Sequence, residues 1–312
     1  MNTLKIAFFG TPDFAADVLR QVLIDTELPV EVRFVVTQPD RPVGRKQVMT
    51  PSPVKLVAQE HAIPVFDTFR VPRSTFQDID LVLLYAYGAL LPADILKIPR
   101  WGFWNIHPSL LPKYRGAAPI AYPLLVGDEV TGVSLMQMDN KWDHGPIIDQ
   151  EEYYILPHET QELLKKRLSD IGYKLFKKNI QLLRIGKLQS KEQDHQQSTY
   201  TRMLTKQDGY VPYPIVQKII QGEQLTETEI PPVISEYCKK YGLPASDYQH
   251  LTVYYSLYCA LYPWPGLWTK LPNDKRLKIT RMDMAYSKPI ITRVQLEGKK
   301  EVDMKTFMSA YL

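Results

Sequence analysis

Short apolar runs alternate with segments of helical periodicity in the first half of the chain. The run at residues 81–84 is apolar throughout, which is typical of a central parallel strand. Runs that also predict buried strands lie at residues 5–9, 30–36, 103–107 and 132–138. Because helical segments separate these runs, we expect right-handed βαβ units and an α/β fold with a doubly wound, mostly parallel sheet.

Two helices are predicted in this half of the chain. Apolar residues recur at helical spacing after Gly10, with Thr11 as the expected cap and Pro12 as the first helical residue. A longer helix is predicted over residues 159–185, where apolar residues repeat about every 3.6 positions and lysines fill the remaining ones. We interpret it as an amphipathic helix that packs on the core and keeps a basic face in water.

The periodicity changes after residues 189–200, a stretch without aliphatic side chains that we interpret as an exposed linker. Residues 214–261 are predicted to be largely helical. Short strands like those of a small antiparallel barrel are predicted at residues 276–280, 290–296 and 301–303. The expected organisation is an N-terminal domain over residues 1–188, a linker over 189–205 and a C-terminal domain over 206–312.

The composition fits this organisation. A length of 312 residues suggests two domains, and 45% hydrophobic with 23% charged residues is ordinary for a globular protein. The apolar runs fall well short of the roughly 20 residues that a membrane-spanning helix needs, and the N-terminus lacks the features of a secretory signal. Only Cys238 and Cys259 are present, too few for a disulfide framework or an all-cysteine zinc site, so we expect a protein of the reducing cytoplasm.

The formal net charge of +4 is unevenly distributed. Residues 201–312 hold 15 Lys and Arg against 11 Asp and Glu, whereas the first 200 residues hold 23 of each kind. The excess in the last third hints at contact with a polyanion. A lysine-rich solvated surface explains the same charge equally well.

The end of the first predicted strand argues against a dinucleotide site. A dinucleotide loop needs three glycines so that its backbone can approach the pyrophosphate. Residues 10–14 contain one glycine, Gly10, and the bulky Phe14. We therefore expect a doubly wound fold that does not bind NAD.

Residues 105–119 contain the most informative pattern. Asn105 and His107 share one face of a predicted strand, because strand side chains two positions apart point the same way. In open α/β sheets ligands bind beyond the carboxyl ends of the strands, and an amide beside an imidazole suits the stabilisation of an oxyanion. Pro108 would end the strand, and an irregular loop rich in proline and glycine follows it.

A second segment, residues 136–147, follows an apolar strand and carries two carboxylates. On the residues alone, Asp139 is expected to be a turn or cap residue. Asp143 fits either a loop aspartate or a carboxylate that stabilises the charged form of His107 and helps to move protons. His144 has no cluster of further ligands nearby, so we interpret it as a surface or packing histidine and expect no metal site.

Several strings together resemble the methionyl-tRNA formyltransferase family. Besides the two segments above, the matching strings lie at residues 9–15, 37–45, 51–55, 86–88, 91–92 and 262–266. Ser109-Leu110-Leu111-Pro112 followed by an Arg-Gly-Ala string is specific to folate-dependent formyltransferases. The loop at residues 37–45 and the Pro-Trp-Pro-Gly string at residues 263–266 narrow the resemblance to the tRNA branch.

The resemblance implies transfer of formyl from 10-formyltetrahydrofolate to the α-amine of methionyl-tRNA without a metal, by a protein that we expect to be a monomer. It makes Asn105, His107 and Asp143 the catalytic set of the N-terminal domain. The folate site that it implies comprises Ser109, Leu110, Leu111, Pro112, Tyr85, Ala86, Tyr87 and Asp139. The implied contacts with the tRNA acceptor end are Arg41, Arg45 and Lys46, and the C-terminal domain would bind tRNA as an OB-fold-like barrel.

Two positions depart from the family pattern, which has glycine in place of Lys141 and threonine in place of His144. A lysine at a position that needs positive φ would be strained, so we expect this loop to run differently. The departures keep a sugar-nucleotide N-formyltransferase open as an alternative, whereas the long C-terminal domain disfavours a glycinamide ribonucleotide formyltransferase. A tRNA-binding protein without catalysis would suit the basic last third of the chain, but the joint presence of the three catalytic candidates argues against it.

Overall fold

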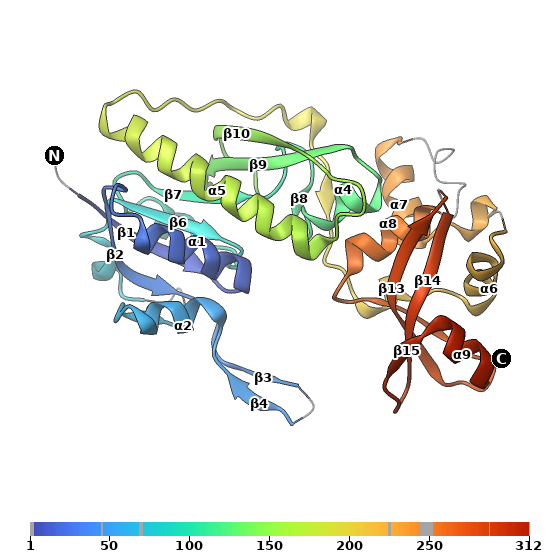
Figure 1. The fold of residues 1–312 in the computed structure, drawn as a ribbon. Coiled ribbons are helices and arrows are strands. Elements are labelled where there is room, and N and C mark those ends of the chain that lie inside the picture. Colours follow the sequence, from blue (N-terminus) through green and yellow to red (C-terminus); the bar gives the residue numbers. More distant parts are fainter. Residues whose placement is uncertain are drawn as a thin grey trace. The chain divides into compact units, whose positions relative to one another are not determined.

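The computed structural model describes residues 3–44, 46–68, 71–223, 226–243, 252–286 and 288–311. The chain forms two compact units, each built from several segments (Figure 1). The first unit comprises Met1–Pro119, Thr131–Tyr153 and Lys165–Thr201, and the second comprises Ile120–Val130, Tyr154–Leu164 and Arg202–Leu312. The last division, after Thr201, falls inside the predicted linker. No sequence pattern predicts that the two earlier segments belong to the second unit.

A seven-stranded sheet forms the centre of the first unit, with the strand order β10-β9-β7-β6-β1-β2-β5. Its strands are β1 (Leu4–Gly10), β2 (Val30–Val36), β5 (Val65–Phe66), β6 (Leu81–Tyr85), β7 (Phe103–His107), β9 (Val130–Gln137) and β10 (Ile147–Tyr154). Strands β5, β2, β1, β6 and β7 are mutually parallel, and β9 pairs antiparallel with β7. The predicted doubly wound, mostly parallel sheet is therefore confirmed.

Helices and short 3-10 turns surround this sheet (Figure 1). They are α1 (Asp13–Ile24), α2 (Pro53–Glu60), η1 (Arg73–Phe76), α3 (Ala93–Leu96) and α5 (Gln161–Arg184). The long helix predicted over residues 159–185 is confirmed as α5. Its Phe176 ring lies 6.4 Å from the ring of Trp104 on β7, and Asp170 accepts a hydrogen bond of 3.1 Å from Gln21 on α1. Helices α1 and α5 therefore pack side by side.

The predicted start of α1 is wrong by one position. Pro12 occupies the cap position in an extended conformation, and the helix begins at Asp13 without a side-chain cap. The carbonyl of Pro12 accepts the first bonds of the helix, from the amides of Ala15 and Ala16. Thr11 cannot cap the helix from one residue further back, and its hydroxyl instead accepts a long bond of 3.4 Å from the Gln38 amide.

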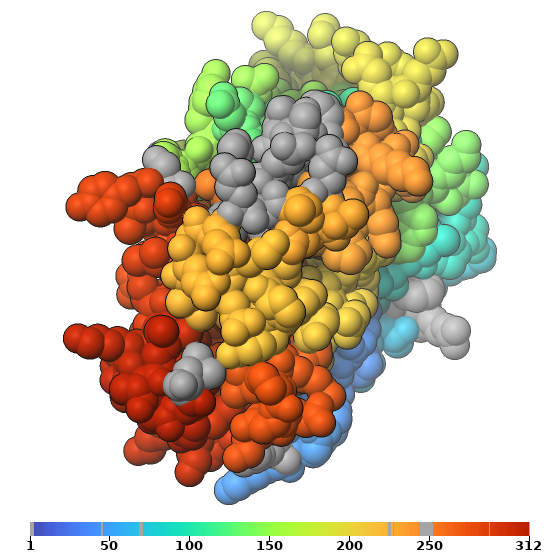
Figure 2. Space-filling model, turned by 90° about the vertical axis from the view of Figure 1, so that its right-hand side faces the viewer, coloured from blue at the N-terminus to red at the C-terminus, as the bar shows by residue number. Residues whose placement is uncertain are grey.

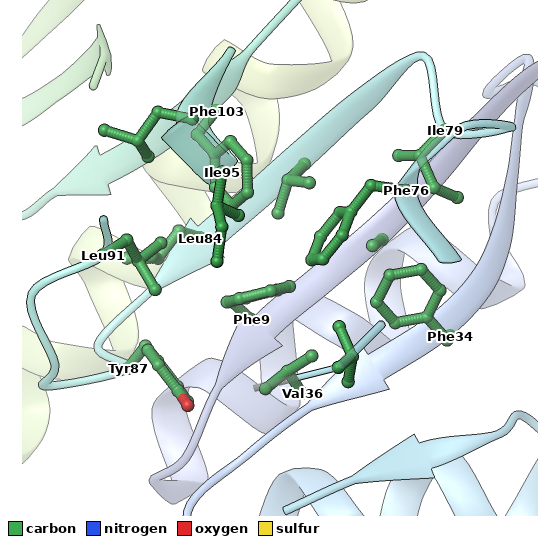
Figure 3. Close-up of a cluster of buried hydrophobic side chains, with 14 residues drawn as sticks. Phe9, Phe34, Val36, Phe76, Ile79, Leu84, Tyr87, Leu91, Ile95 and Phe103 are labelled. Atoms are coloured by element: carbon green, nitrogen blue, oxygen red, sulfur yellow. The ribbon is translucent and has the colours of Figure 1, made fainter. Parts of the chain in front are cut away.

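An aromatic cluster fills the core on one side of the sheet (Figure 3). Phe9 on β1 lies at its centre, with ring centroids 5.3 Å from Tyr87 and 5.6 Å from Phe103 in edge-to-face arrangements. Phe76 joins Phe34 to this group at 5.5 Å. Such pairs add to the stabilisation from burial, so the carboxyl ends of β1 and β6 and the start of β7 are held by one packed cluster.

Two short pairs of strands complete the first unit. Strands β3 (Arg41–Val43) and β4 (Val48–Thr50) form an exposed antiparallel hairpin. Strand β8 (Arg115–Gly116) pairs in parallel with β11 (Tyr200–Thr201), which follows the short turn η2 (His195–Gln197). The pairing of β8 with β11 joins the loop after β7 to a segment more than eighty residues further along the chain.

The second unit combines helices with a four-stranded antiparallel sheet of order β12-β13-β14-β15. Its strands are β12 (Leu267–Lys270), β13 (Arg276–Ala285), β14 (Lys288–Leu296) and β15 (Glu301–Asp303). Its helices and turns are α4 (Ala121–Leu125), η3 (Lys206–Gly209), α6 (Tyr213–Gln221), η4 (Glu227–Glu229), α7 (Pro232–Tyr241), α8 (Thr252–Leu261) and α9 (Met304–Tyr311). The predicted change to short antiparallel strands in the last part of the chain is confirmed.

Alternation of apolar and polar side chains orients this sheet. Leu277 and Ile279 on β13 are buried with Val294 and Leu296 on β14, while Lys278 between the first two is exposed and Gln295 between the last two is half-buried. Figure 2 looks onto this unit, where the red surface of α9 and the last strands adjoins the yellow-orange surface of α6. Among the described residues, no helix has the length and apolar character required to cross a membrane.

Candidate active site

Strand β7 presents Asn105 and His107 near its carboxyl end. These side chains alternate with Trp104 and Ile106, so they share the face of Phe103, opposite the face against which α5 packs. All five residues of β7 are buried. A central strand covered on both faces therefore carries two polar side chains, which need hydrogen-bond partners in the interior.

The loop between β9 and β10 supplies a carboxylate to this pair. The loop is closed at its base, because the Gln137 amide donates to the Pro146 carbonyl over 2.9 Å and the Met138 amide donates to the Phe103 carbonyl over 2.8 Å. A Cβ atom on Gly145 would lie only 2.1 Å from the Gln137 carbonyl oxygen, so this position requires glycine. Asp143 has a positive φ of 48°, a left-handed conformation that aspartate adopts more readily than most residues.

The three predicted catalytic side chains converge. Asn105 donates from Nδ2 to Asp143 Oδ1 over 3.3 Å, and His107 Nδ1 lies 3.5 Å from the same oxygen. Asp143 Oδ2 accepts from the Gly116 backbone amide over 2.8 Å. The carboxylate keeps only 12% of its side-chain surface exposed and the imidazole 4%. The structure therefore brings an amide, an imidazole and a carboxylate together where little of their surface is exposed to solvent.

The hydrogen bonds also define the state of the imidazole. His107 Nε2 lies 3.1 Å from the Tyr114 carbonyl oxygen, which can only accept, so Nε2 carries a proton. Nδ1 is left to face Asp143 and the space beside Asn105. A second proton on Nδ1 gives an imidazolium next to a carboxylate, an arrangement that can stabilise an oxyanion and relay a proton.

The predicted folate loop is rigid. The Ser109 hydroxyl donates to the Lys113 carbonyl over 2.7 Å, and the Ser134 hydroxyl donates to the Ser109 carbonyl over 2.6 Å. The Leu111 amide donates back to Ser134 over 2.9 Å. Ser109 and Leu111 are buried, whereas Leu110 and Pro112 retain partial exposure. Any ligand contact by this loop would involve its backbone and the two partly exposed side chains.

Tyr85, Ala86 and Tyr87 lie where β6 ends, beside the end of β1. The chain order reverses between these two strands, and ligands bind at such positions in open α/β sheets. The Tyr85 side chain is fully buried with its hydroxyl 3.1 Å from Ser169, and burial raises its pKa far above the ordinary value. Tyr87 packs in the aromatic cluster. Both side chains are therefore packed inside the unit. The Tyr87 carbonyl accepts from Gln38 Nε2 over 3.3 Å, and Ala86 between the two tyrosines has a positive φ of 50°.

Asp139 stabilises the turn that leads to Asp143. Its Oδ1 accepts from the Lys141 amide over 2.9 Å and its Oδ2 lies 2.6 Å from His144 Nδ1. The His144 ring stacks on the His195 ring with centroids 3.9 Å apart. The positive φ in this loop falls on Asp143, while Lys141 has no positive φ, so the loop avoids the strain expected at the lysine.

Two of the three residues expected to contact tRNA, Arg41 and Lys46, lie on the β3–β4 hairpin. Arg41 and Lys46 are exposed, and Arg41 donates to the Gln38 side chain over 3.1 Å. Arg45 lies outside the described residues. The hairpin also exposes apolar side chains at Val43, Val48 and Met49. The tRNA role of the hairpin stays a prediction.

Two site residues were missed in the sequence because they lie in segments interpreted as loop or linker. Arg115 is 1% exposed, and Gln193 is 5% exposed although it lies in the stretch predicted to be an exposed linker. That interpretation is wrong at Gln193, because its amide is fully hydrogen-bonded to buried partners. A lone glutamine among polar residues carries no sequence signal of burial.

Hydrogen bonding and burial alter the acidity of two side chains beside Arg115. Desolvation lowers the pKa of His195, and the neighbouring charges of His144 and Arg115 lower it further. The hydrogen bond from Arg115 lowers the pKa of the Tyr200 hydroxyl. Within the part of the chain that the structure describes, no three His, Cys, Asp or Glu side chains are grouped so as to hold a metal ion.

Comparison with known proteins agrees with this geometry. Residues 4–180 match the formyl transferase family, which defines the class of this α/β unit. A methionyl-tRNA formyltransferase of Bacillus cytotoxicus is 41% identical over 97% of this chain and 98% of its own length. One of Geobacter sulfurreducens is 33% identical over 100% and 95%. The chain belongs to the methionyl-tRNA formyltransferase family.

Solved structures share the fold at lower identity. A 4-N formyltransferase from Francisella tularensis superimposes with a TM-score of 0.62 at 15% identity, covering 90% of this chain and 98% of that one. A sugar 3N-formyl transferase, solved with dTDP and 5-N-formyl-THF, gives a TM-score of 0.60 at 19% identity over 97% and 98%. At these identities the similarity concerns the fold.

Proposed function

We propose that this protein transfers the formyl group of 10-formyltetrahydrofolate to the α-amine of methionyl-tRNA. The observation that carries the proposal is the convergence of Asn105, His107 and Asp143 at the carboxyl end of β7, in a chain with full-length relatives of this family. The folate is a cosubstrate, and it leaves as tetrahydrofolate.

The first step is attack by the amine nitrogen on the formyl carbon. A C–N bond forms, and the carbonyl electron pair moves to oxygen to give a tetrahedral oxyanion. Asn105 has a second Nδ2 proton that does not point at Asp143 and can donate to this oxyanion. Because Nε2 of His107 is bonded to the Tyr114 carbonyl, Nδ1 is the ring atom that donates and neutralises.

Asp143 serves both partners in this scheme. Its charge, 3.5 Å from His107 Nδ1, stabilises the imidazolium, and it accepts the proton that the attacking amine releases, directly or through a water. The intermediate then collapses, the bond from carbon to N10 of the folate breaks, and N10 takes up the proton that Asp143 accepted, which restores the carboxylate. The bond from Gly116 to the other carboxylate oxygen holds Asp143 in place during these steps.

We propose that the folate lies along the loop of residues 109–112 and the backbone at residues 85–87. Both segments lie at the carboxyl edge of the parallel strands, on either side of the position of His107. The neighbouring sugar 3N-formyl transferase was solved with a formyl-THF, in keeping with a folate on this fold. The β3–β4 hairpin is proposed to bind the tRNA acceptor end.

One assay tests the proposal against its alternatives. Purified protein is incubated with 10-formyltetrahydrofolate and either charged initiator tRNA, uncharged tRNA or an amino-sugar nucleotide, and tetrahydrofolate release is followed. Release that requires methionyl-tRNA is expected. Release only with the sugar nucleotide would make the protein a sugar N-formyltransferase, and tRNA binding without release would make it a non-catalytic binding protein.

A further inference from the structure

The segment of residues 191–201, which we call the crossing segment, is fixed at both ends to the walls of the site. Near its start, Lys191 and Ile147 exchange two backbone hydrogen bonds of 2.8 Å, directly after the loop that carries Asp143. At its end, β11 pairs with β8, so that Thr201 lies opposite Gly116. The crossing segment therefore spans from one wall of the carboxylate site to the other.

Gln193 is the least exposed residue of the crossing segment. Its Nε2 donates to the backbone carbonyls of Asp143 and Gly145, over 3.0 Å and 2.7 Å. Its Oε1 accepts from Arg115 Nε and Nη2, over 3.2 Å and 2.6 Å. Carbonyls only accept and a guanidinium only donates, so the partners fix the orientation of this amide and use all of its hydrogen-bonding capacity.

Arg115 anchors the amide. Its guanidinium is buried and also donates to the Tyr200 hydroxyl over 3.1 Å and to His195 Nδ1 over 2.9 Å. The lowered pKa of His195 agrees with a neutral ring that accepts at Nδ1. Each of these acceptors is neutral and lies in the crossing segment, so among the described residues the buried cation donates its side-chain hydrogen bonds to that segment.

The residues on either side of Arg115 reach the catalytic candidates. The Tyr114 carbonyl accepts from His107 Nε2, and the Gly116 amide donates to Asp143 Oδ2. Asp143 sits in a left-handed conformation with φ 48°, which its surroundings must stabilise. Gln193 binds the carbonyl of Asp143 itself and the carbonyl two residues later, so the amide fixes the backbone from which the carboxylate points.

We propose that Gln193 is a positioning residue for the transfer reaction. Its amide holds the backbone of residues 143–145 so that the Asp143 carboxylate stays within reach of Asn105 and His107, and Arg115 holds the amide. This inference rests on the proposed function, in which Asp143 handles the proton of the attacking amine. Gln193 itself touches no reacting atom.

Gln193→Glu tests the role because it keeps the acceptor for Arg115 and removes the donor to the two carbonyls. Steady-state kinetics should show kcat reduced by roughly tenfold to a hundredfold, the range that a small misplacement of a catalytic group produces. The KM values for folate and methionyl-tRNA should change by less than about threefold, because the substrate contacts remain. The matched control is Gln196→Glu, an exposed glutamine of the same segment, which should behave as wild type. Gln193→Met, which adds no charge, replaces the glutamate variant if that variant does not fold.

A double variant shows whether Gln193 acts through Asp143. In an Asp143→Asn background, Gln193→Glu should lower kcat by less than about twofold more, because the group that it positions is already disabled. Full multiplication of the two single effects would overturn the inference, as would a wild-type kcat for Gln193→Glu in an otherwise active enzyme.

Hydrogen exchange separates this inference from the proposed function. Amides of residues 139–145 should exchange faster in Gln193→Glu than in wild type, while those of β1 and β6 should not change. If the wild-type protein transfers no formyl, the proposed function fails and the exchange result decides the positioning claim alone. Unchanged exchange in residues 139–145 would refute it.

Discussion

Replacement of Asp143 by asparagine removes a charge and almost no volume. At an effective dielectric constant of about 20, opposite unit charges 3.5 Å apart attract by roughly 5 kcal/mol. Solvent weakens this attraction, because the carboxylate is 12% exposed, and part of the attraction already exists before the reaction starts. We therefore expect the carboxylate to stabilise the transition state by about 3 kcal/mol more than the ground state. Each 1.36 kcal/mol is tenfold in rate, and kcat should therefore fall by roughly a hundredfold.

The assay is release of tetrahydrofolate in the presence of charged initiator tRNA, with kcat and both KM values determined. The control is Asp17→Asn on α1, where the carboxylate is 47% exposed and pairs only with Arg20 among the described residues, so its kcat should not change. The melting temperature of Asp143→Asn should stay within a few degrees of wild type, because the side chain keeps its size. A folded Asp143→Asn protein with a kcat within threefold of wild type would refute the role given to the carboxylate.

Three further outcomes follow from the geometry. Gly145→Ala should lower both kcat and the melting temperature, since a Cβ would lie 2.1 Å from the Gln137 carbonyl oxygen, and an unchanged melting curve would contradict that contact. Hydrogen bonds from Lys177 and Tyr173 lower the Asp25 pKa to about 2. The ionised Asp25 therefore contributes its full stabilisation above about pH 4, and this stabilisation is lost as the pH falls through 2. The stability of Asp25→Asn should lack this part of the decrease at acid pH. Arg41→Ala should raise the KM for methionyl-tRNA, and the tRNA affinity should depend less steeply on salt concentration, by roughly one phosphate contact. An unchanged salt dependence of the affinity would contradict a place for Arg41 in the tRNA site.

The strands of the central sheet could be predicted because buried strands appear in the sequence as short apolar runs. Strands β2 and β7 begin and end where the apolar runs at residues 30–36 and 103–107 do. The alternation on β7 also placed Asn105 and His107 on one face. Local periodicity thus determines both a buried strand and the direction of its polar side chains.

The rest of the site depends on contacts that no local pattern encodes. Asp143 reaches β7 through a loop whose path is set by a left-handed residue and by the close approach of Gly145 to β9, so only the family resemblance singled it out. Gln193 lies in a stretch whose composition predicts solvent exposure, and its burial follows from a pairing with Arg115 across 78 positions of sequence. The start of α1 was misplaced because proline can occupy either the cap or the first helical position.

The second unit borrows two early stretches of chain, residues 120–130 and 154–164. Within that unit α4 packs against α8, and the buried Tyr122 ring lies 4.7 Å from the ring of Tyr237. Truncation after Thr201 would therefore remove the packing partners of these stretches and expose apolar surface, so it would not yield a stable catalytic fragment. During synthesis, α4 can complete its packing only after about the last third of the polypeptide has been made, because α8 lies in that part of the chain.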